Sequence, residues 1–314
     1  MNQSKTLLNP DVVIVGAGVA GIYMLHKLKN MGLTTVVFEK SDELGGTWNW
    51  NRYPGARCDI PSLEYSYQFD ENLQQDWNWS EKYSAQPEIL EYLNHVADRF
   101  ELRKDISFEE EVLEAQFNEE LSLWDIKTNK EVYQSKFCIF ATGCLSVPNK
   151  PDIEGLEDFE GQLLSTSYWP REEVDLSNKN VAIIGTGSSS IQTIPEIAKE
   201  VKNLYVFQRT PNYSIPSNNG PMDKEIEADI KSRYAEFRKE NWSNGFGIAG
   251  IADEALIAES DIDEVNNQLE ENWNNNGLGF FGGYADVPVD ANANEVAAGF
   301  VKNKIKEIVK DPET

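Results

Sequence analysis

The chain has 314 residues, which is enough for more than one hydrophobic core. Its 53 Asp and Glu residues outnumber 28 Lys and Arg residues, and the net charge of -25 argues against general binding to nucleic acid or to an anionic membrane surface. Cys58, Cys138 and Cys144 lack metal-ligand spacing and predict free thiols in a reducing compartment. No apolar run reaches the roughly 18 residues of a spanning helix. We therefore expect a cytoplasmic protein without a metal site or a membrane span.

The first glycine-rich turn follows the apolar stretch Asp11–Val15 and precedes a predicted helix. Glycines at 16, 18 and 21 let the backbone approach a pyrophosphate at the helix N-terminus, where the dipole and free N–H groups hold phosphate. The next predicted strand, Thr35–Phe38, ends at Glu39, whose carboxylate can accept both ribose hydroxyls of an adenosine. The alternative is an ordinary tight turn and a solvated acid.

A second turn of this kind, from Gly185 to Ser190, follows the predicted strand Asn180–Ile184, with Ser190 in place of the third glycine. The next strand, Leu204–Phe207, is followed by Gln-Arg-Thr instead of an acid. An arginine here can form two parallel hydrogen bonds to a 2'-phosphate, so NADPH is favoured over NADH. A surface arginine in a turn before a proline is the alternative. Two different dinucleotide units predict an enzyme that uses FAD and a nicotinamide.

Several motifs resemble those of the Baeyer-Villiger monooxygenases, and the resemblance covers essentially the whole chain. They are Gly45-Gly46-Thr47-Trp48, the run from Arg52 to Asp59, Ala141-Thr142-Gly143 and Phe207-Gln-Arg-Thr-Pro211. Between the two turns the family carries Phe-x-Gly-x-x-x-His-x-x-x-Trp-Pro. Here Phe159, Gly161, Trp169 and Pro170 match it, but Ser165 replaces the histidine that belongs to a linker between the domains.

The resemblance implies a monooxygenase whose FAD, reduced by NADPH, reacts with O2 to a flavin peroxide that inserts one oxygen next to a ketone carbonyl. It gives Asp59 a supporting catalytic role near the flavin, whereas a carboxylate that caps a loop is the alternative. The family's active-site arginine lies on a later segment without a counterpart here. We therefore expect the N-terminal portion of the family fold, and a complementary C-terminal chain is a possible partner.

The turns and the resemblance together give a set of residues expected to bind the two cofactors. They are Gly16, Gly18, Ala20, Gly21, Glu39, Lys40, Gly46, Thr47, Trp48, Arg57, Cys58, Asp59, Tyr65, Val112, Gly185, Thr186, Gly187, Ser188, Ser189, Ser190, Gln192, Arg209 and Thr210.

The expected fold is α/β, with two Rossmann-like dinucleotide-binding units and a mostly helical insertion, and with the C-terminal part of the family fold absent. We expect an FAD domain over residues 1–148, an NADPH domain over 149–222 and the helical insertion over 223–314. Helical spacing is present at Gln86–Phe100, Lys224–Glu240 and Glu254–Trp273. Trp242, Trp273, Phe280 and Phe281 are interpreted as core or lid packing.

Three other functions stay open. The chain could oxidise nitrogen or sulfur centres, act as an NADPH oxidase, or be an FAD-binding fragment or subunit of a split enzyme that is inactive alone. Substrate identity is not readable from these residues.

Overall fold

The computed structural model describes residues 9–243, 247–248, 255–275, 277, 280 and 283–311. Contacts divide the chain into two compact units: Met1–Ala56 with Gln86–Asp175, and Arg57–Ala85 with Leu176–Thr314. Each unit contains a parallel strand pair joined through a helix, which confirms the predicted α/β class. None of the helices in the described part combines the length and apolar character that crossing a membrane requires.

The first unit is built around a parallel sheet in the order β3-β2-β1-β7. Its strands are β1 (Val12–Val15), β2 (Thr35–Phe38), β3 (Ile106–Ser107) and β7 (Phe137–Phe140). Val12, Val13 and Ile14 of β1 are at most 1% exposed, which explains the apolar run, because a parallel strand buried on both faces needs apolar side chains on both. Helix α1 (Val19–Asn30) buries Ile22 and Leu25, and it connects β1 to β2.

A three-stranded antiparallel sheet completes the core of the first unit. It consists of β4 (Val112–Asn118), β5 (Leu123–Thr128) and β6 (Val132–Ser135). Ile126 of β5 packs with Val13 and Phe38 of the parallel sheet. The remaining elements are helix α2 (Thr47–Trp50), helix α4 (Gln86–Arg99) and the 3₁₀ turns η1 (Arg103–Asp105) and η2 (Leu156–Asp158). The predicted helix at 86–100 is thus confirmed, with its end at Arg99.

The second unit contains a parallel pair of strands, β8 (Asn180–Ile184) and β9 (Asn203–Phe207), connected by helix α5 (Ser188–Ile197). The register pairs Ile184 with Phe207. Both side chains are exposed, by 67% and 59%, and Tyr205 on the same strand is 53% exposed. The described part of the chain therefore leaves one apolar face of this sheet uncovered.

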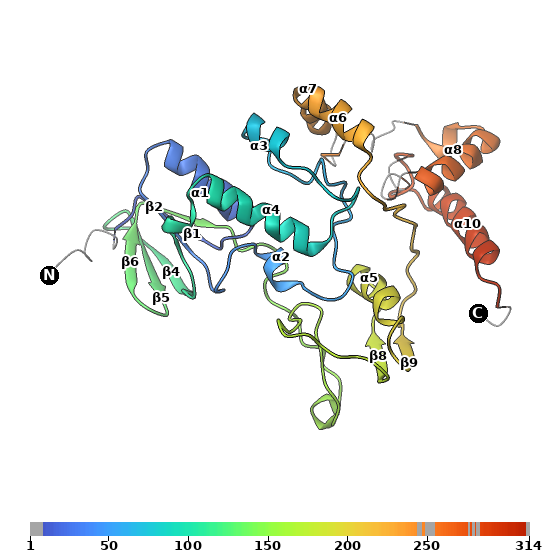
Figure 1. Ribbon diagram of the computed structural model, residues 1–314, viewed down its shortest axis with the longest axis horizontal. Coiled ribbons are helices and arrows are strands. Elements are labelled where there is room, and N and C mark those ends of the chain that lie inside the picture. Colours follow the sequence, from blue (N-terminus) through green and yellow to red (C-terminus); the bar gives the residue numbers. More distant parts are fainter. Residues whose placement is uncertain are drawn as a thin grey trace. The chain divides into compact units, whose positions relative to one another are not determined.

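The rest of the second unit is helical. Its helices are α3 (Glu71–Asp76), α6 (Lys224–Ser232), α7 (Tyr234–Trp242), α8 (Ile262–Asn275) and α10 (Ala291–Ile308), with a 3₁₀ turn η3 (Ile257–Glu259). Helices α8 and α10 pack together (Figure 1). Leu269, Trp273 and Phe280 lie in their core with Val301.

The helical spacing over 224–240 is present as two helices, because the backbone leaves helical geometry at Arg233, with φ of -132° and ψ of 32°. One expectation for this helical part is wrong. Trp242, expected in packing, is 77% exposed and donates its indole N–H to Gln68 Oε1 at 3.2 Å. Phe281 lies outside the described residues.

Candidate functional site

Three loops of the first unit meet at the carboxyl ends of β1 and β7. Gly16 has a φ of +101°, and a Cβ added there would lie 2.7 Å from the carbonyl oxygen of Ala141. A Cβ added to Gly46 would lie 2.8 Å from the Cα of Gly18. Only glycine permits both approaches, so the turn after β1, the Gly45-Gly46 turn and the Ala141-Thr142-Gly143 turn form one closely packed edge.

Helix α1 presents its N-terminus at this edge. Its N-cap residue is Gly18, whose lack of a side chain leaves the helix without a side-chain cap, and the first turn holds no acid. The backbone N–H groups at a helix start carry a partial positive charge. The edge is therefore suited to an anion such as a pyrophosphate.

Glu39 follows β2 at the same edge and is only 5% exposed. One carboxylate oxygen accepts the N–H of Ala17 at 2.7 Å, and the other accepts the N–H of Ser41 at 2.8 Å. Each carboxylate oxygen has two lone pairs, so each can accept one more donor, such as a ribose hydroxyl. The two backbone bonds hold the carboxylate in place for that role.

The other predicted residues of the first unit have mixed surroundings. Lys40 forms an ion pair with Glu111 at 2.9 Å, and this hydrogen bond raises the pKa of the lysine. Trp48 is buried, and its carbonyl accepts a hydrogen bond from Gln86. Val112 begins β4 and packs against the core cluster. Ala20 and Gly21 lie in the first turn of α1, and Thr47 begins α2.

The turn of the second unit repeats the geometry of the first. Gly185 has a φ of +107°, Gly187 is the N-cap of α5 without a side-chain cap, and Ser188, Ser189 and Ser190 form the first turn. Thr186 Oγ1 accepts a hydrogen bond from Gln208 Nε2 at 2.9 Å, which joins this turn to the end of β9. The α5 N-terminus is thus also suited to phosphate.

Arg209 and Thr210 follow the end of β9 and are exposed. No carboxylate among the described residues forms an ion pair with Arg209. Its guanidinium is therefore available for an anionic group of a ligand.

The loop that contains Arg57, Cys58 and Asp59 belongs to the second unit. The Arg57 guanidinium pairs with Glu81 Oε2 at 2.8 Å and also donates to the carbonyl of Tyr83 at 3.2 Å. Asn219 donates to the same Glu81 oxygen at 2.7 Å. Arg57 is thus engaged by protein groups in this structure.

Helix α5 reaches the same loop through Gln192, which bonds to Arg57 and to Asp59. Cys58 is buried, and burial raises the pKa of its thiol to about 11, so it stays protonated at neutral pH. Tyr65 is half-buried, and its N–H donates to the carbonyl of Pro61.

The segment around Ser165 packs on α2 within the first unit. The ring of Tyr168 lies edge-on to that of Trp50, with centroids 5.6 Å apart. Arg171 binds Asp42 with both terminal nitrogens, one of them at 2.8 Å. Ser165 pairs with Tyr168 in an isolated β-bridge. The linker motif thus contacts the helix that follows Gly46.

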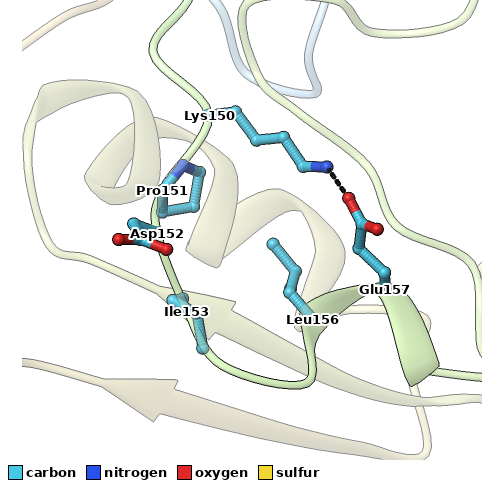
Figure 2. A pocket seen from close by; sticks show the side chains of 6 residues that line it. All are labelled: Lys150, Pro151, Asp152, Ile153, Leu156 and Glu157. Atoms are coloured by element: carbon cyan, nitrogen blue, oxygen red, sulfur yellow. Dashed lines mark hydrogen bonds and ion pairs between the residues drawn. The ribbon is translucent and has the colours of Figure 1, made fainter.

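A hollow of about 320 Å³ lies elsewhere on the first unit, at residues 150–157. Figure 2 shows Lys150 and Glu157 facing each other there, and they form an ion pair at 2.7 Å. The hollow shares no residue with the predicted cofactor-binding set, and its ion pair is exposed, so it contributes nothing to the candidate site.

Residues that support the site but were not predicted are Glu81, Asn219, Asp42, Asn49 and Arg171. They hold the predicted loops in place: Asn49, for example, accepts hydrogen bonds from Arg52 at 2.6 Å through its backbone carbonyl and from Arg171 at 3.4 Å through its side chain. Asn49 and Arg171 are 122 positions apart, and neither belongs to the motifs quoted above. No sequence pattern identifies them.

Comparison with known proteins agrees with this geometry. The family described as pyridine nucleotide-disulphide oxidoreductase matches residues 13–276. A Baeyer-Villiger monooxygenase of Pseudooceanicola batsensis is 42% identical over 309 residues, which cover 96% of this chain and 56% of the relative. A phenazine N-monooxygenase of Lysobacter antibioticus is 38% identical, over 97% of this chain and 57% of its own length.

A solved structure of an oxidised steroid monooxygenase bound to NADP superimposes with a TM-score of 0.93 at 44% identity, over 97% of this chain and 58% of the other. The chain therefore spans somewhat more than half the length of the relatives that it matches. It belongs to the pyridine nucleotide-disulphide oxidoreductase family and, within it, corresponds to the N-terminal portion of the Baeyer-Villiger monooxygenases.

Proposed function

We propose that this chain forms the FAD- and NADPH-binding part of a monooxygenase of the Baeyer-Villiger type. The observation that carries the proposal is the contrast between its two dinucleotide units. In one, the strand after the glycine turn ends in a buried carboxylate, Glu39; in the other, it ends in an exposed guanidinium, Arg209. A carboxylate suits ribose hydroxyls, and a guanidinium suits a 2'-phosphate.

The residues of the first unit fit FAD. The α1 N-terminus would hold the pyrophosphate, and the glycine contacts at Gly16 and Gly46 leave the backbone bare where a ligand approaches. Glu39 would accept the ribose hydroxyls, while Trp48 and Thr47 would lie along the adjoining loop. When bound, FAD supplies the redox chemistry that passes electrons from a nicotinamide to O2.

The residues of the second unit fit NADPH. The α5 N-terminus, from Gly187 to Ser190, would bind its pyrophosphate, and Arg209 with Thr210 would bind its 2'-phosphate. The remaining predicted contacts lie on the loop at 57–65. Asp59 is exposed on that loop, and we assign to it the supporting catalytic role that the resemblance implies.

For the whole enzyme we propose a ketone as the substrate class, with one oxygen atom of O2 inserted beside its carbonyl. Relatives with this chemistry in their names, such as cyclohexanone 1,2-monooxygenase of Acinetobacter, support the proposal. The chain matches somewhat more than half of these relatives, so we also propose that the whole reaction requires the C-terminal portion of the family fold. Free thiols at Cys58, Cys138 and Cys144 support a reducing, cytoplasmic compartment.

A second candidate is oxidation of a nitrogen centre. The 38% identity to a phenazine N-monooxygenase favours it, since that relative is covered as fully as the Baeyer-Villiger enzyme. Product analysis with paired ketone, thioether and heteroaromatic amine substrates would separate the two candidates.

The experiment that tests the proposal is a visible absorption spectrum of the purified chain after incubation with FAD and removal of free FAD. We expect retained flavin that bleaches when NADPH is added without oxygen. A colourless protein would mean that these residues do not form an FAD site by themselves. Retained flavin that NADPH fails to bleach would count against the NADPH assignment of the second unit.

A further inference from the structure

The side chain of Gln192 bonds to three groups of the loop at 57–59. Its Oε1 accepts the N–H of Arg57 at 3.3 Å, and its Nε2 donates to the carbonyl of Arg57 at 3.1 Å. The same Nε2 donates to Asp59 Oδ1 at 3.1 Å. The amide therefore pairs with both backbone groups of Arg57, as a neighbouring peptide group would, and also holds the carboxylate two residues later.

Asp59 depends on this contact. The side chain of Asp59 is exposed, and Gln192 is its one hydrogen-bond partner among the described residues. Arg57 is also held by Glu81 and by the carbonyl of Tyr83, and the N–H of Cys58 donates to the carbonyl of Ser84, so the loop keeps other attachments when the Gln192 contact is removed. Without Gln192, the backbone of Arg57 would stay near its place, but the Asp59 carboxylate would be free to rotate.

Helix α5 connects Gln192 to the second glycine turn. The helix starts at Ser188, where the turn ends, and Gln192 lies four residues later on the same face. The backbone between them is held by Thr193, whose hydroxyl donates to the carbonyl of Ser189 at 2.8 Å. A group bound at the start of α5 is therefore one helical turn away from the residue that holds Asp59.

We propose that Gln192 is a positioning residue that fixes the Asp59 carboxylate relative to the N-terminus of α5. Through it, occupation of the second glycine turn by a dinucleotide orders the loop at 57–59. This second part rests on the proposed function, because it requires NADP to bind at that turn. The first part concerns the chain alone.

The first part is tested by hydrogen exchange of the Arg57 and Asp59 amides in the chain without nucleotide. We expect Gln192→Ala to lower their protection by about tenfold, because the Arg57 N–H loses its acceptor and the loop loses the two bonds that Gln192 Nε2 donates. Gln192→Glu keeps the shape but places a carboxylate against Asp59, and we expect an equal or larger loss. Glu196→Ala, on the exposed side of the same helix, is the control and should change nothing.

A polarity swap separates hydrogen bonding from packing. In the double variant Gln192→Glu with Asp59→Asn, the new asparagine amide can donate to the new carboxylate, whereas the bond to the Arg57 carbonyl stays lost. We therefore expect the loop to recover part of the protection that Gln192→Glu removes. If Gln192→Glu alone leaves protection unchanged, or if Asp59→Asn fails to rescue it, the positioning role is wrong. Circular dichroism of each variant shows whether the chain is still folded.

The second part is tested with NADP⁺ as the probe. We expect saturating NADP⁺ to raise the protection of the 57–59 amides in the original chain and to do so much less in Gln192→Ala, with saturation of each protein verified by its own NADP⁺ titration. Equal protection in both proteins would overturn the coupling. If the original chain binds no NADP⁺, the NADPH assignment and the coupling both fail, while the exchange data without nucleotide still decide the positioning role.

Discussion

The carboxylate of Glu39 accepts a hydrogen bond at 2.7 Å from the backbone N–H of Ala17, which lies within the first glycine turn. The bond joins the end of β2 to the turn that starts α1, so the acid is part of the turn's own structure. If Glu39 also binds the FAD ribose, as proposed, its replacement should weaken FAD binding more than replacement of a neighbouring surface acid does.

For Glu39→Gln we expect FAD to bind about 10 to 100 times more weakly, because an amide is a poorer acceptor than a carboxylate and the charge-assisted bonds are lost. Titration of FAD against the chain, followed by quenching of flavin fluorescence, measures the change. Glu43→Gln, at an exposed position close by, is the control. If Glu39→Gln binds FAD as tightly as the original chain does, Glu39 does not contribute to FAD binding.

For Arg209→Gln we expect affinity for NADPH to fall by about 10 to 100 times while affinity for NADH is unchanged, because only NADPH carries the 2'-phosphate. Fluorescence titration with each nucleotide gives both constants. Lys199→Gln removes another exposed cation from the same unit and should leave both constants unaltered. An equal loss for the two nucleotides would show that Arg209 does not recognise the 2'-phosphate.

Gly16 and Gly185 offer a matched pair for separating backbone strain from collision. Both have φ near +100°, but an added Cβ meets the Ala141 carbonyl at Gly16 and has nothing within 4 Å at Gly185. We expect Gly185→Ala to cost about 1 to 2 kcal/mol from strain alone. Gly16→Ala should cost clearly more, seen as a larger drop in the thermal unfolding midpoint. Similar drops in the midpoint for the two variants would mean that the loop at Ala141 moves away from the added Cβ at little energetic cost.

Glu64 predicts a pH dependence of stability in the second unit. Burial raises its pKa to about 7 from an ordinary value of 4.5, against the opposing effect of its own backbone N–H and of Arg238 and Lys82. A carboxyl with a raised pKa stabilises the fold fully below the unfolded value, and this contribution is lost as pH rises through the folded value. We expect up to about 3 kcal/mol to be lost between pH 4.5 and 8.

The comparison that isolates this effect is Glu64→Gln, which cannot ionise. Urea unfolding of both proteins at several pH values should show the variant gaining stability relative to the original as pH rises over that window. Glu91→Gln, an exposed acid on α4, should follow the original chain. A constant difference between Glu64→Gln and the original would show that Glu64 does not titrate in this range.

Local patterns predicted the parts of the site that local rules govern. A glycine turn after an apolar strand requires only neighbouring residues, so the positions of Gly16, Gly187 and Glu39 follow from sequence. Some of the contacts that position the loops join residues more than 100 positions apart, such as Gln192 with Arg57 at a separation of 135. No periodicity encodes such pairs.

Trp242 illustrates a different limit. Helical spacing over 224–240 predicts apolar residues on one face, but the break at Arg233 changes the direction of the second helix relative to the first. Spacing counted from the first helix therefore does not predict whether Trp242, at the end of the second helix, is buried. Trp273 and Phe280, which belong to the α8 and α10 core, were assigned to packing correctly.

The uncovered face of β8 and β9 makes the behaviour of this chain in solution depend on salt. Ile184, Tyr205 and Phe207 offer an apolar surface on which two copies attract each other, whereas a net charge of -25 on each copy keeps them apart. Dissolved salt shortens the reach of that repulsion to about 10 Å at 0.1 M, but it does not weaken the apolar attraction. Dilute buffer therefore favours dispersed molecules, and concentrated salt favours association through this sheet.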